Sequence, residues 1–259
     1  MNSLSGFSLA PRLRAGETVY TAWCALAAPI VAESIAREGF AAIVLDQQHG
    51  LFDIATSAQA IAALRHAGAS AIVRVPLNDY PSASRALDLG ADAVIAPMIN
   101  SADHARRFVA AMKYPPIGER SWGPSRAAAL AGIADLKDYF RGANAATLAF
   151  AMIETREALD HVAVIAATEG IDGLFVGPFD LSVALSSGAV LDPFSREVEA
   201  ALDVVLDAAR KAEKIPGIYC SNAEVALTAA RRGFRFIAVG GDLSYLRAGA
   251  SEQLRKLKS

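Results

Sequence analysis

The sequence predicts a single (β/α)₈ barrel, and three observations support this α/β fold class. Short apolar runs, typical of strands buried on both faces, alternate with longer segments of helical periodicity. Eight such strand-then-helix units fill 259 residues, which is close to the usual barrel length of about 250. The turn after the first apolar run lacks the glycine-rich pattern of dinucleotide-binding open sheets, the alternative architecture. We see no linker, so we expect residues 1–259 to form one domain.

The apolar and amphipathic segments follow one another in the order of barrel strands and helices. Gly39 and Gly90 directly follow two amphipathic segments, at the position where glycine often ends a helix. Residues 1–16 have mixed polarity and are expected to form a short helix or an arm. Strands are expected at residues 18–23, 41–45, 71–75, 93–96, 148–153, 173–176, 216–219 and 235–239. Helices are expected at residues 29–38, 54–66, 82–89, 102–112, 156–167, 194–213, 223–232 and 243–257.

Residues 113–144 interrupt this alternation. The stretch 114–126 contains three prolines and two glycines, a density at which regular secondary structure is not expected. A long irregular insertion in a compact domain is usually a functional loop or an oligomer contact. We expect one of these two roles for this segment.

The composition excludes several classes of protein. Hydrophobic residues make up 53% and charged residues 20%, which is typical of a globular chain. The net charge is −2 with no basic run, so neither nucleic acid nor a membrane surface is an expected partner. No segment has the pattern of a signal peptide or a membrane span. The two cysteines, Cys24 and Cys220, are expected to be packing residues in a reduced, cytoplasmic protein.

Two carboxylates directly follow neighbouring predicted strands. Glu154 comes at once after the fifth strand, and Asp180 follows the sixth after a short turn. Barrels carry their chemistry at the carboxyl ends of the strands. Two carboxylates at this rim are suited to hold one hard divalent cation through oxygen. The alternative is that each residue only caps the helix that follows it; we favour the metal site.

Other side chains with chemical potential lie at the same expected rim. His49 follows the second strand and is a candidate general acid or base, or a structural loop histidine. Arg74 ends the third strand and offers a permanent cation to a carboxylate or an enolate oxygen, or a structural ion pair to Asp46. Trp23 ends the first strand. By helix propensity alone, Asp88 is a solvated helix residue.

Two turns that contain glycine are candidate anion sites. Gly177, Pro178 and Phe179 lead toward Asp180, and free backbone N–H groups before a helix bind anions. Gly240-Gly241 follows the last strand, where many barrels bind phosphate, although two glycines often form only a turn. No predicted strand ends in a lysine, so a Schiff-base mechanism is not expected.

Seven motifs occur together and in order, and as a set they resemble the HpcH/HpaI family of class II, pyruvate-dependent aldolases. The similarity runs from about residue 8 to about residue 250. The motifs are His49-Gly50, Arg74-Val-Pro76, Arg85-Ala-Leu-Asp-Leu-Gly90, Pro97-Met98-Ile-Asn100, Tyr114-Pro-Pro-Ile-Gly118, Ile153-Glu-Thr-Arg-Glu-Ala158 and Val176-Gly-Pro-Phe-Asp-Leu-Ser182.

The resemblance implies a barrel of the phosphoenolpyruvate/pyruvate type that assembles as a homohexamer, a trimer of dimers with exchanged C-terminal helices. It implies that Glu154 and Asp180 bind one divalent ion, Mg²⁺, Mn²⁺ or Co²⁺, which a 2-oxo acid such as pyruvate or hydroxypyruvate chelates. The second substrate is an aldehyde, and the reverse reaction cleaves a 4-hydroxy-2-oxo acid.

The resemblance also implies roles for individual side chains. Arg74 matches the arginine that stabilises the enolate. His49 matches the acid/base residue and Asp88 its carboxylate partner, with Asp46 in the same network. Backbone amides around Gly177, Pro178 and Phe179 match the carboxylate pocket. Arg126 resembles a residue near the aldehyde site.

The chain departs from many members of that family at three places. Gln47-Gln48 stands where Gly-Glu is common, Met152 stands where glutamine is common, and the loop reads Arg120-Ser-Trp-Gly123 where Arg-Gly-x-Gly is common. Trp122 is expected to reshape the aldehyde pocket, so these changes bear on the choice of acceptor.

Three alternative functions remain open at this stage. A CoA-thioester lyase of the citrate or malyl type requires a nucleotide cleft and a chain extension, and no spare segment is evident for either. A non-catalytic oxo-acid-binding protein does not require His49, Arg74 and Asp88 together. A phosphate-bearing substrate rests on Gly240-Gly241 alone.

Overall fold

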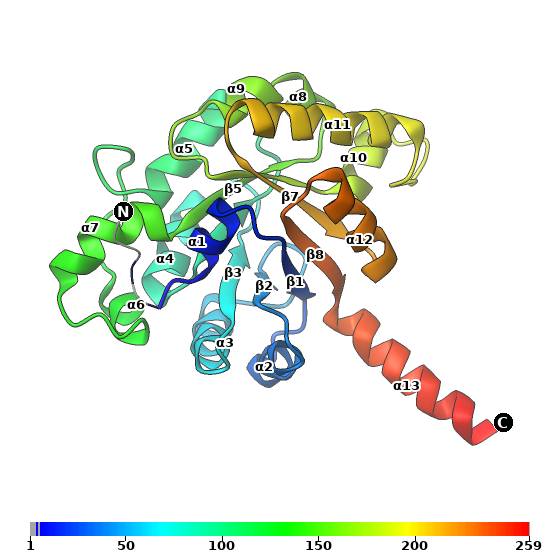
Figure 1. Cartoon of the computed structure of the whole chain (residues 1–259), viewed down its shortest axis with the longest axis horizontal. Helices are drawn as coiled ribbons and strands as arrows, with labels where there is room; N and C mark the ends of the chain where they lie inside the picture. Colours follow the sequence, from blue (N-terminus) through cyan, green and yellow to red (C-terminus); the bar gives the residue numbers. More distant parts are fainter. Residues whose placement is uncertain (1–3, 5, 259) are drawn as a thin grey trace.

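The computed structural model describes residue 4 and residues 6–258, so residues 1–3, 5 and 259 of the expected domain lie outside the described part. Eight parallel strands close into a barrel in sequential order from β1 to β8, which confirms the predicted (β/α)₈ fold (Figure 1). The strands are β1 (Val19–Cys24), β2 (Ala42–Asp46), β3 (Ser70–Arg74), β4 (Ala93–Ala96), β5 (Leu148–Ile153), β6 (Gly173–Val176), β7 (Ile215–Cys220) and β8 (Phe236–Gly241).

Helices surround the barrel on its outer face. The helices are α1 (Leu9–Arg14), α2 (Pro29–Arg37), α3 (Ile54–His66), α4 (Tyr80–Leu89), α5 (Ala102–Met112), α6 (Ser125–Leu130), α7 (Leu136–Ala146), α8 (Arg156–Asp160), α9 (Val162–Ala166), α10 (Pro178–Leu185), α11 (Arg196–Lys211), α12 (Ala223–Arg232) and α13 (Asp242–Lys258). Within the described part of the chain, no helix combines the length and apolar character that a bilayer crossing requires.

Alternate residues along each strand build two separate layers of core. In β2, Ile43 and Leu45 face the surrounding helices, whereas Val44 faces the barrel interior. The interior is filled with large side chains such as Phe150 and Phe175. Because strands of a parallel barrel are buried on both faces, they read as continuous apolar runs, and this explains why the sequence predicts them well.

Three predicted elements differ from the structure. The insertion at residues 113–144 is irregular only up to residue 124, because it then forms α6 and α7. These helices pack an apolar cluster of their own around Tyr139 and Tyr114. The predicted helix 156–167 is broken at His161 into α8 and α9, and α10 replaces the loop expected after β6. The prolines at the start of the insertion therefore do not predict the secondary structure of the residues that follow them.

The two ends of the barrel differ in character. At the amino ends of the strands, α1 places Leu9 and Leu13 in the interior core. The C-terminal helix α13 projects away from the barrel (Figure 1). Among its described residues, Asp242 is the one that is buried. The carboxyl ends of the strands carry the polar side chains discussed next.

Candidate active site

A cavity of about 200 Å³ lies at the carboxyl ends of the strands, and most of the sequence-predicted site residues line it. Its walls come from β1, β3, β5 and β7, from the turn after β2, and from the start of α10. The lining residues are Trp23, His49, Arg74, Met152, Gly177, Pro178, Phe179, Asp180 and Tyr219.

Glu154 is held rigidly beside this cavity, directly after β5. Its side chain is buried, with 3% of the residue exposed, and its Oε1 accepts a hydrogen bond from the Met98 backbone N–H at 2.8 Å. A Cβ at Gly177 would lie 2.6 Å from Glu154 Oε2, so only glycine leaves room for this carboxylate. The hydroxyl of Thr155, not Glu154, caps α8 by accepting from the Ala158 N–H at 2.9 Å. Helix capping therefore does not explain why a buried carboxylate stands at position 154.

Asp180 lies in the first turn of α10 and lines the cavity. Burial, and after it the negative charge of Asp180, raise the pKa of Glu154 to about 7. The Met98 N–H and the Arg74 charge oppose this shift only in part. Glu154 is buried and Asp180 is exposed, and their mutual repulsion is what a divalent cation between two carboxylates relieves, so these residues fit such an ion. In the described residues, no group of three or more His, Cys, Asp or Glu side chains converges.

Arg74 and Asp46 form a buried, two-bonded ion pair. Arg74 Nε and Nη2 donate to the two carboxylate oxygens of Asp46 at 2.8 and 2.6 Å. Trp23 Nε1 donates to the same carboxylate at 3.2 Å, and the guanidinium lies 4.8 Å from the Trp23 ring centroid. Although burial alone would raise it, the bonds from Arg74 hold the pKa of Asp46 below its ordinary value. The ion pair that the sequence predicts as an alternative role of Arg74 is thus present. It also holds the Arg74 guanidinium in a fixed orientation at the wall of the cavity.

His49 lines the cavity with an exposed side chain, and its backbone N–H donates to Asp46 at 3.3 Å. Two predicted site residues lie elsewhere in this chain. Asp88 is paired with Arg120 at 2.6 Å, and the exposed Arg126 donates to the Ala58 carbonyl at 3.1 Å. A single chain therefore does not bring Asp88 to His49.

Two further side chains line the cavity, Met152 and Tyr219. Tyr219 packs against Trp23 and Phe179, with ring centroids 5.7 and 6.1 Å apart. It lies near the end of β7, so the strand-end rule applied to the seventh strand would have found it. Met152 faces inward from the penultimate position of β5, and its place in the alternation of that strand brings it to the cavity.

The turn after β8 does not present free amides to a phosphate. Gly240 and Gly241 belong to β8, and Asp242 begins α13. The buried Asp242 carboxylate accepts from the Ala25 and Leu26 N–H groups at 2.9 and 2.8 Å. At the turn itself, the Gly241 N–H donates to the Ser244 hydroxyl at 3.1 Å and the Leu243 N–H donates to the Asp242 carboxylate at 2.8 Å. The protein's own side chains therefore occupy these amides, which removes the support for a phosphate-bearing substrate.

Known proteins resemble this chain over nearly its whole length. The model of the HpcH/HpaI aldolase/citrate lyase family matches residues 20–248. A hydroxypyruvate/pyruvate aldolase of Rhizorhabdus wittichii is 35% identical over 92% of this chain and 93% of its own. A 4-hydroxy-2-oxo-heptane-1,7-dioate aldolase of Salmonella dublin is 36% identical over 92% of this chain and 89% of its own.

A solved structure agrees with these sequence relatives. The crystal structure of an HpcH/HpaI aldolase/citrate lyase family protein from Burkholderia cenocepacia superimposes with a TM-score of 0.89 at 32% identity, and covers 98% of this chain and 100% of its own. Fold, strand-end residues and sequence relatives agree, and the chain belongs to the HpcH/HpaI aldolase/citrate lyase family.

Proposed function

We propose that this protein is a divalent-metal-dependent class II aldolase. It forms the enolate of pyruvate or hydroxypyruvate and adds it reversibly to an aldehyde, or cleaves 4-hydroxy-2-oxo acids. The observation that carries this proposal is the buried Glu154 carboxylate, whose pKa is raised to about 7 by burial and by Asp180, beside the cation of Arg74. Family membership and the names of the two sequence relatives support the same activity.

Glu154 and Asp180 would hold the ion, which is Mg²⁺, Mn²⁺ or Co²⁺. When bound, such an ion supplies Lewis-acid polarisation of the oxo acid. Arg74, oriented by both of its bonds to Asp46, binds the keto oxygen on which negative charge develops. His49 moves the proton of the substrate methyl group, because an imidazole can both accept and donate a proton and His49 lines the cavity.

The start of α10 forms the carboxylate pocket of this proposal. N–H groups in the first turn of a helix have no partner within the helix, and Phe179 and Asp180 carry two of them. Pro178 has no N–H and shapes the turn instead. The buried Lys113 bonds to Asp172 at 2.7 Å and to the Thr147 carbonyl at 2.7 Å, so it is not available for Schiff-base chemistry.

Asp88 and Arg126 are proposed to serve the site of a neighbouring copy in a homohexamer. Four leucines of α13 support this assembly, because each is between 51% and 85% exposed in one chain; they are Leu243, Leu246, Leu254 and Leu257. We propose that α13 is exchanged between two subunits of a dimer. Light scattering after size-exclusion chromatography is expected to give six chains, and a monomer at micromolar concentration would contradict the proposal. Two free, buried cysteines suit a reducing compartment, and we place the protein in the cytoplasm.

The decisive experiment measures pyruvate release from a 4-hydroxy-2-oxo acid before and after removal of metal with EDTA. Activity is expected to fall to background and to return on addition of Mn²⁺ or Mg²⁺. Undiminished activity in fully metal-free protein would refute the mechanism.

A further inference from the structure

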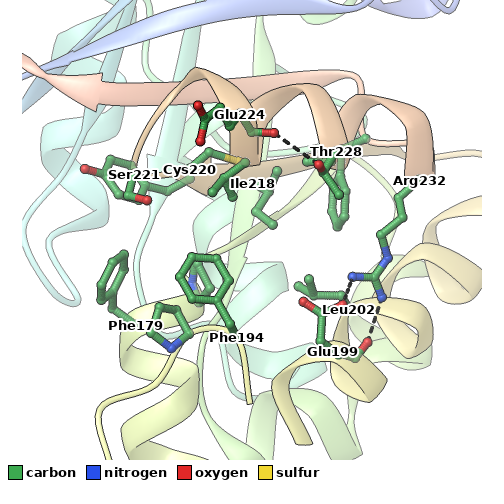
Figure 2. Close-up of a pocket in the computed structure, with 16 residues that line it drawn as sticks. Phe179, Phe194, Glu199, Leu202, Ile218, Cys220, Ser221, Glu224, Thr228 and Arg232 are labelled. Carbon is green, nitrogen blue, oxygen red and sulfur yellow. Dashed lines mark hydrogen bonds and ion pairs between the residues drawn. The ribbon is translucent and has the colours of Figure 1, made fainter. Parts of the chain in front are cut away.

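A second cavity of about 290 Å³ (Figure 2) shares part of its lining with the reaction cavity. It lies between the start of α10, the segment before α11, the end of β7 and one face of α12. Its apolar walls include Phe179, Phe194, Leu202, Ile218, Val225 and Phe234. Cavities of this kind hold apolar groups, and about 150 Å³ already suffices for a benzene ring.

Two polar side chains of this second cavity, Arg232 and Thr228, are already paired. Arg232 donates to the Glu199 carboxylate and carbonyl, and to Asp203 at 2.8 Å. The Thr228 hydroxyl donates to the Glu224 carbonyl at 3.1 Å. Figure 2 shows Arg232 directed toward Glu199 at the edge of the cavity. Since this guanidinium is neutralised by two carboxylates, the cavity favours an uncharged apolar ligand over a phosphate or a carboxylate.

The two cavities share one wall. Pro178, Phe179 and Tyr219 line both of them, and the rings of Phe179 and Tyr219 meet edge to face with centroids 6.1 Å apart. Phe179 is half-buried, and it lines the reaction cavity together with Asp180 and the second cavity together with Val225. A molecule whose reactive carbonyl lies in the reaction cavity would reach the second cavity by extending an apolar group past these rings.

We propose that the second cavity binds the apolar side group, an aryl or branched alkyl group, of the aldehyde acceptor. This inference rests on the proposed aldolase function. In the reaction, the methyl carbon of pyruvate loses a proton and forms a bond to the aldehyde carbon. The aldehyde oxygen takes up a proton, so the product is a 4-hydroxy-2-oxo acid whose C4 carries the apolar group. That group leaves water for the apolar wall, which favours aryl aldehydes over acetaldehyde.

The test fills the cavity from the side that is remote from the reacting atoms. Val225→Trp and Thr228→Trp place an indole into it from α12, and Leu227→Trp is the matched control because Leu227 is exposed and does not line the cavity. The substrates are the pyruvate adducts of benzaldehyde and of acetaldehyde. The readout is the ratio of their kcat/KM values in the cleavage direction. Exchange of the pyruvate methyl protons in D₂O measures enolate formation without any acceptor.

Both cavity variants are expected to lower the aryl-to-methyl ratio about tenfold or more, the range by which a shaped apolar pocket discriminates. Methyl-proton exchange is expected to stay within about twofold of the parent, and Leu227→Trp is expected to change neither quantity. An unchanged ratio in a folded variant would overturn the inference while proton exchange still upholds the aldolase function. Absence of proton exchange in the unmodified protein would instead overturn the proposed function. Thr228 is exposed, so a larger side chain there is expected to leave the fold intact. If Val225→Trp does not fold, the aryl-to-methyl ratio of Thr228→Trp tests the inference.

Discussion

Three neighbours set the charge of the buried Glu154 carboxylate. Asp180 disfavours its ionised form, whereas the Met98 N–H and the Arg74 guanidinium favour it. Burial is the largest effect and also disfavours the charge, so the pKa lies near 7 rather than near its ordinary value. A proton and the proposed metal ion would therefore compete for the same carboxylate in the physiological pH range.

This competition predicts pH-dependent metal affinity. Below a pKa of about 7 the carboxylate is protonated, so the affinity for Mn²⁺ should fall about tenfold for each further pH unit and level off above pH 7. Titration calorimetry at pH 6, 7 and 8 measures this. Glu154→Gln should abolish detectable binding, whereas Glu157→Gln, an exposed position on α8, should not. Equal affinity at all three pH values would contradict the assignment.

Gly177 offers a second test of the same carboxylate. In Gly177→Ala the new Cβ would lie 2.6 Å from Glu154 Oε2 and 3.0 Å from Met152 Cε, so the carboxylate must move. We expect Mn²⁺ affinity to fall about tenfold or more, as is typical when support for a metal ligand is lost. Gly249→Ala on α13 is the control, since no described atom lies within 4 Å of its Cβ. Parent-like affinity in Gly177→Ala would show that the carboxylate is free to shift.

At the scale of elements, the turn between β4 and α5 holds Glu154 through its backbone. Met98 adopts a φ of +49°, a conformation that is costly for a residue with a side chain, and there its N–H points at Glu154. Asn100 anchors the turn, because its Oδ1 accepts from the Thr155 hydroxyl at 2.7 Å. His161 Nδ1 lies 3.0 Å from the Asn100 carbonyl, which only accepts, so this nitrogen carries the proton.

Loosening this anchor should weaken the metal site without dismantling the barrel. Asn100→Ala removes one side-chain hydrogen bond, so the free energy of unfolding should fall by about 1 kcal/mol. Mn²⁺ affinity should fall severalfold because the Met98 N–H is less well fixed. Thr155→Ser retains the hydroxyl and should behave like the parent in both measurements. A loss of stability with unchanged affinity would mean that Asn100 supports only the fold.

Prediction from sequence succeeded for elements whose pattern is local and failed where distant contacts decide. The eight strands read as apolar runs because both of their faces are buried. By contrast, α6 and α7 are stabilised by an apolar cluster that includes Phe7 from the start of the chain, and no local pattern reports this contact. Helix α10 has Pro178 at its first position, where proline favours a helix start. We nevertheless predict a loop for this segment from the sequence.

At the scale of the whole molecule, the two ends of the barrel divide chemistry from stability. Chemical groups gather at the carboxyl ends of the strands, whereas the ion pairs of Asp172 and Asp92, which line no reaction cavity, lie at the amino ends. Asp172 precedes β6 and pairs with Lys113 and Arg14 at 2.7 and 2.9 Å. Asp92 precedes β4, pairs with Arg65 at 3.3 Å and accepts from the Ala71 N–H at 3.1 Å.

Asp92 predicts a pH-dependent term in stability. Burial raises its pKa to about 6, although Arg65 and the Ala71 N–H oppose the shift, while an unfolded aspartate titrates near about 4. The folded protein therefore holds this proton more tightly, and its contribution to stability falls as pH rises from about 4 to about 6 and is then constant. The two-unit difference corresponds to about 3 kcal/mol.

Urea denaturation at fixed protein concentration checks this term. The stability of Asp92→Asn relative to the parent should rise by about 3 kcal/mol between pH 4 and pH 7, because the amide does not ionise. Asp160→Asn, at an exposed position of α8, should show no such trend. A difference between Asp92→Asn and the parent that is independent of pH would contradict the raised pKa.

The amino-acid order alone determined the barrel and the rim on which its reactive groups stand. Both follow from short-range patterns: apolar runs make buried strands, and side chains just past them face one end of a parallel barrel. The tertiary structure decided which of those groups share a cavity. It added Met152 and Tyr219, placed Asp88 and Arg126 elsewhere in the chain, and raised the pKa of Glu154. Burial and charge repulsion arise between residues far apart in the chain, so only the folded molecule defines them.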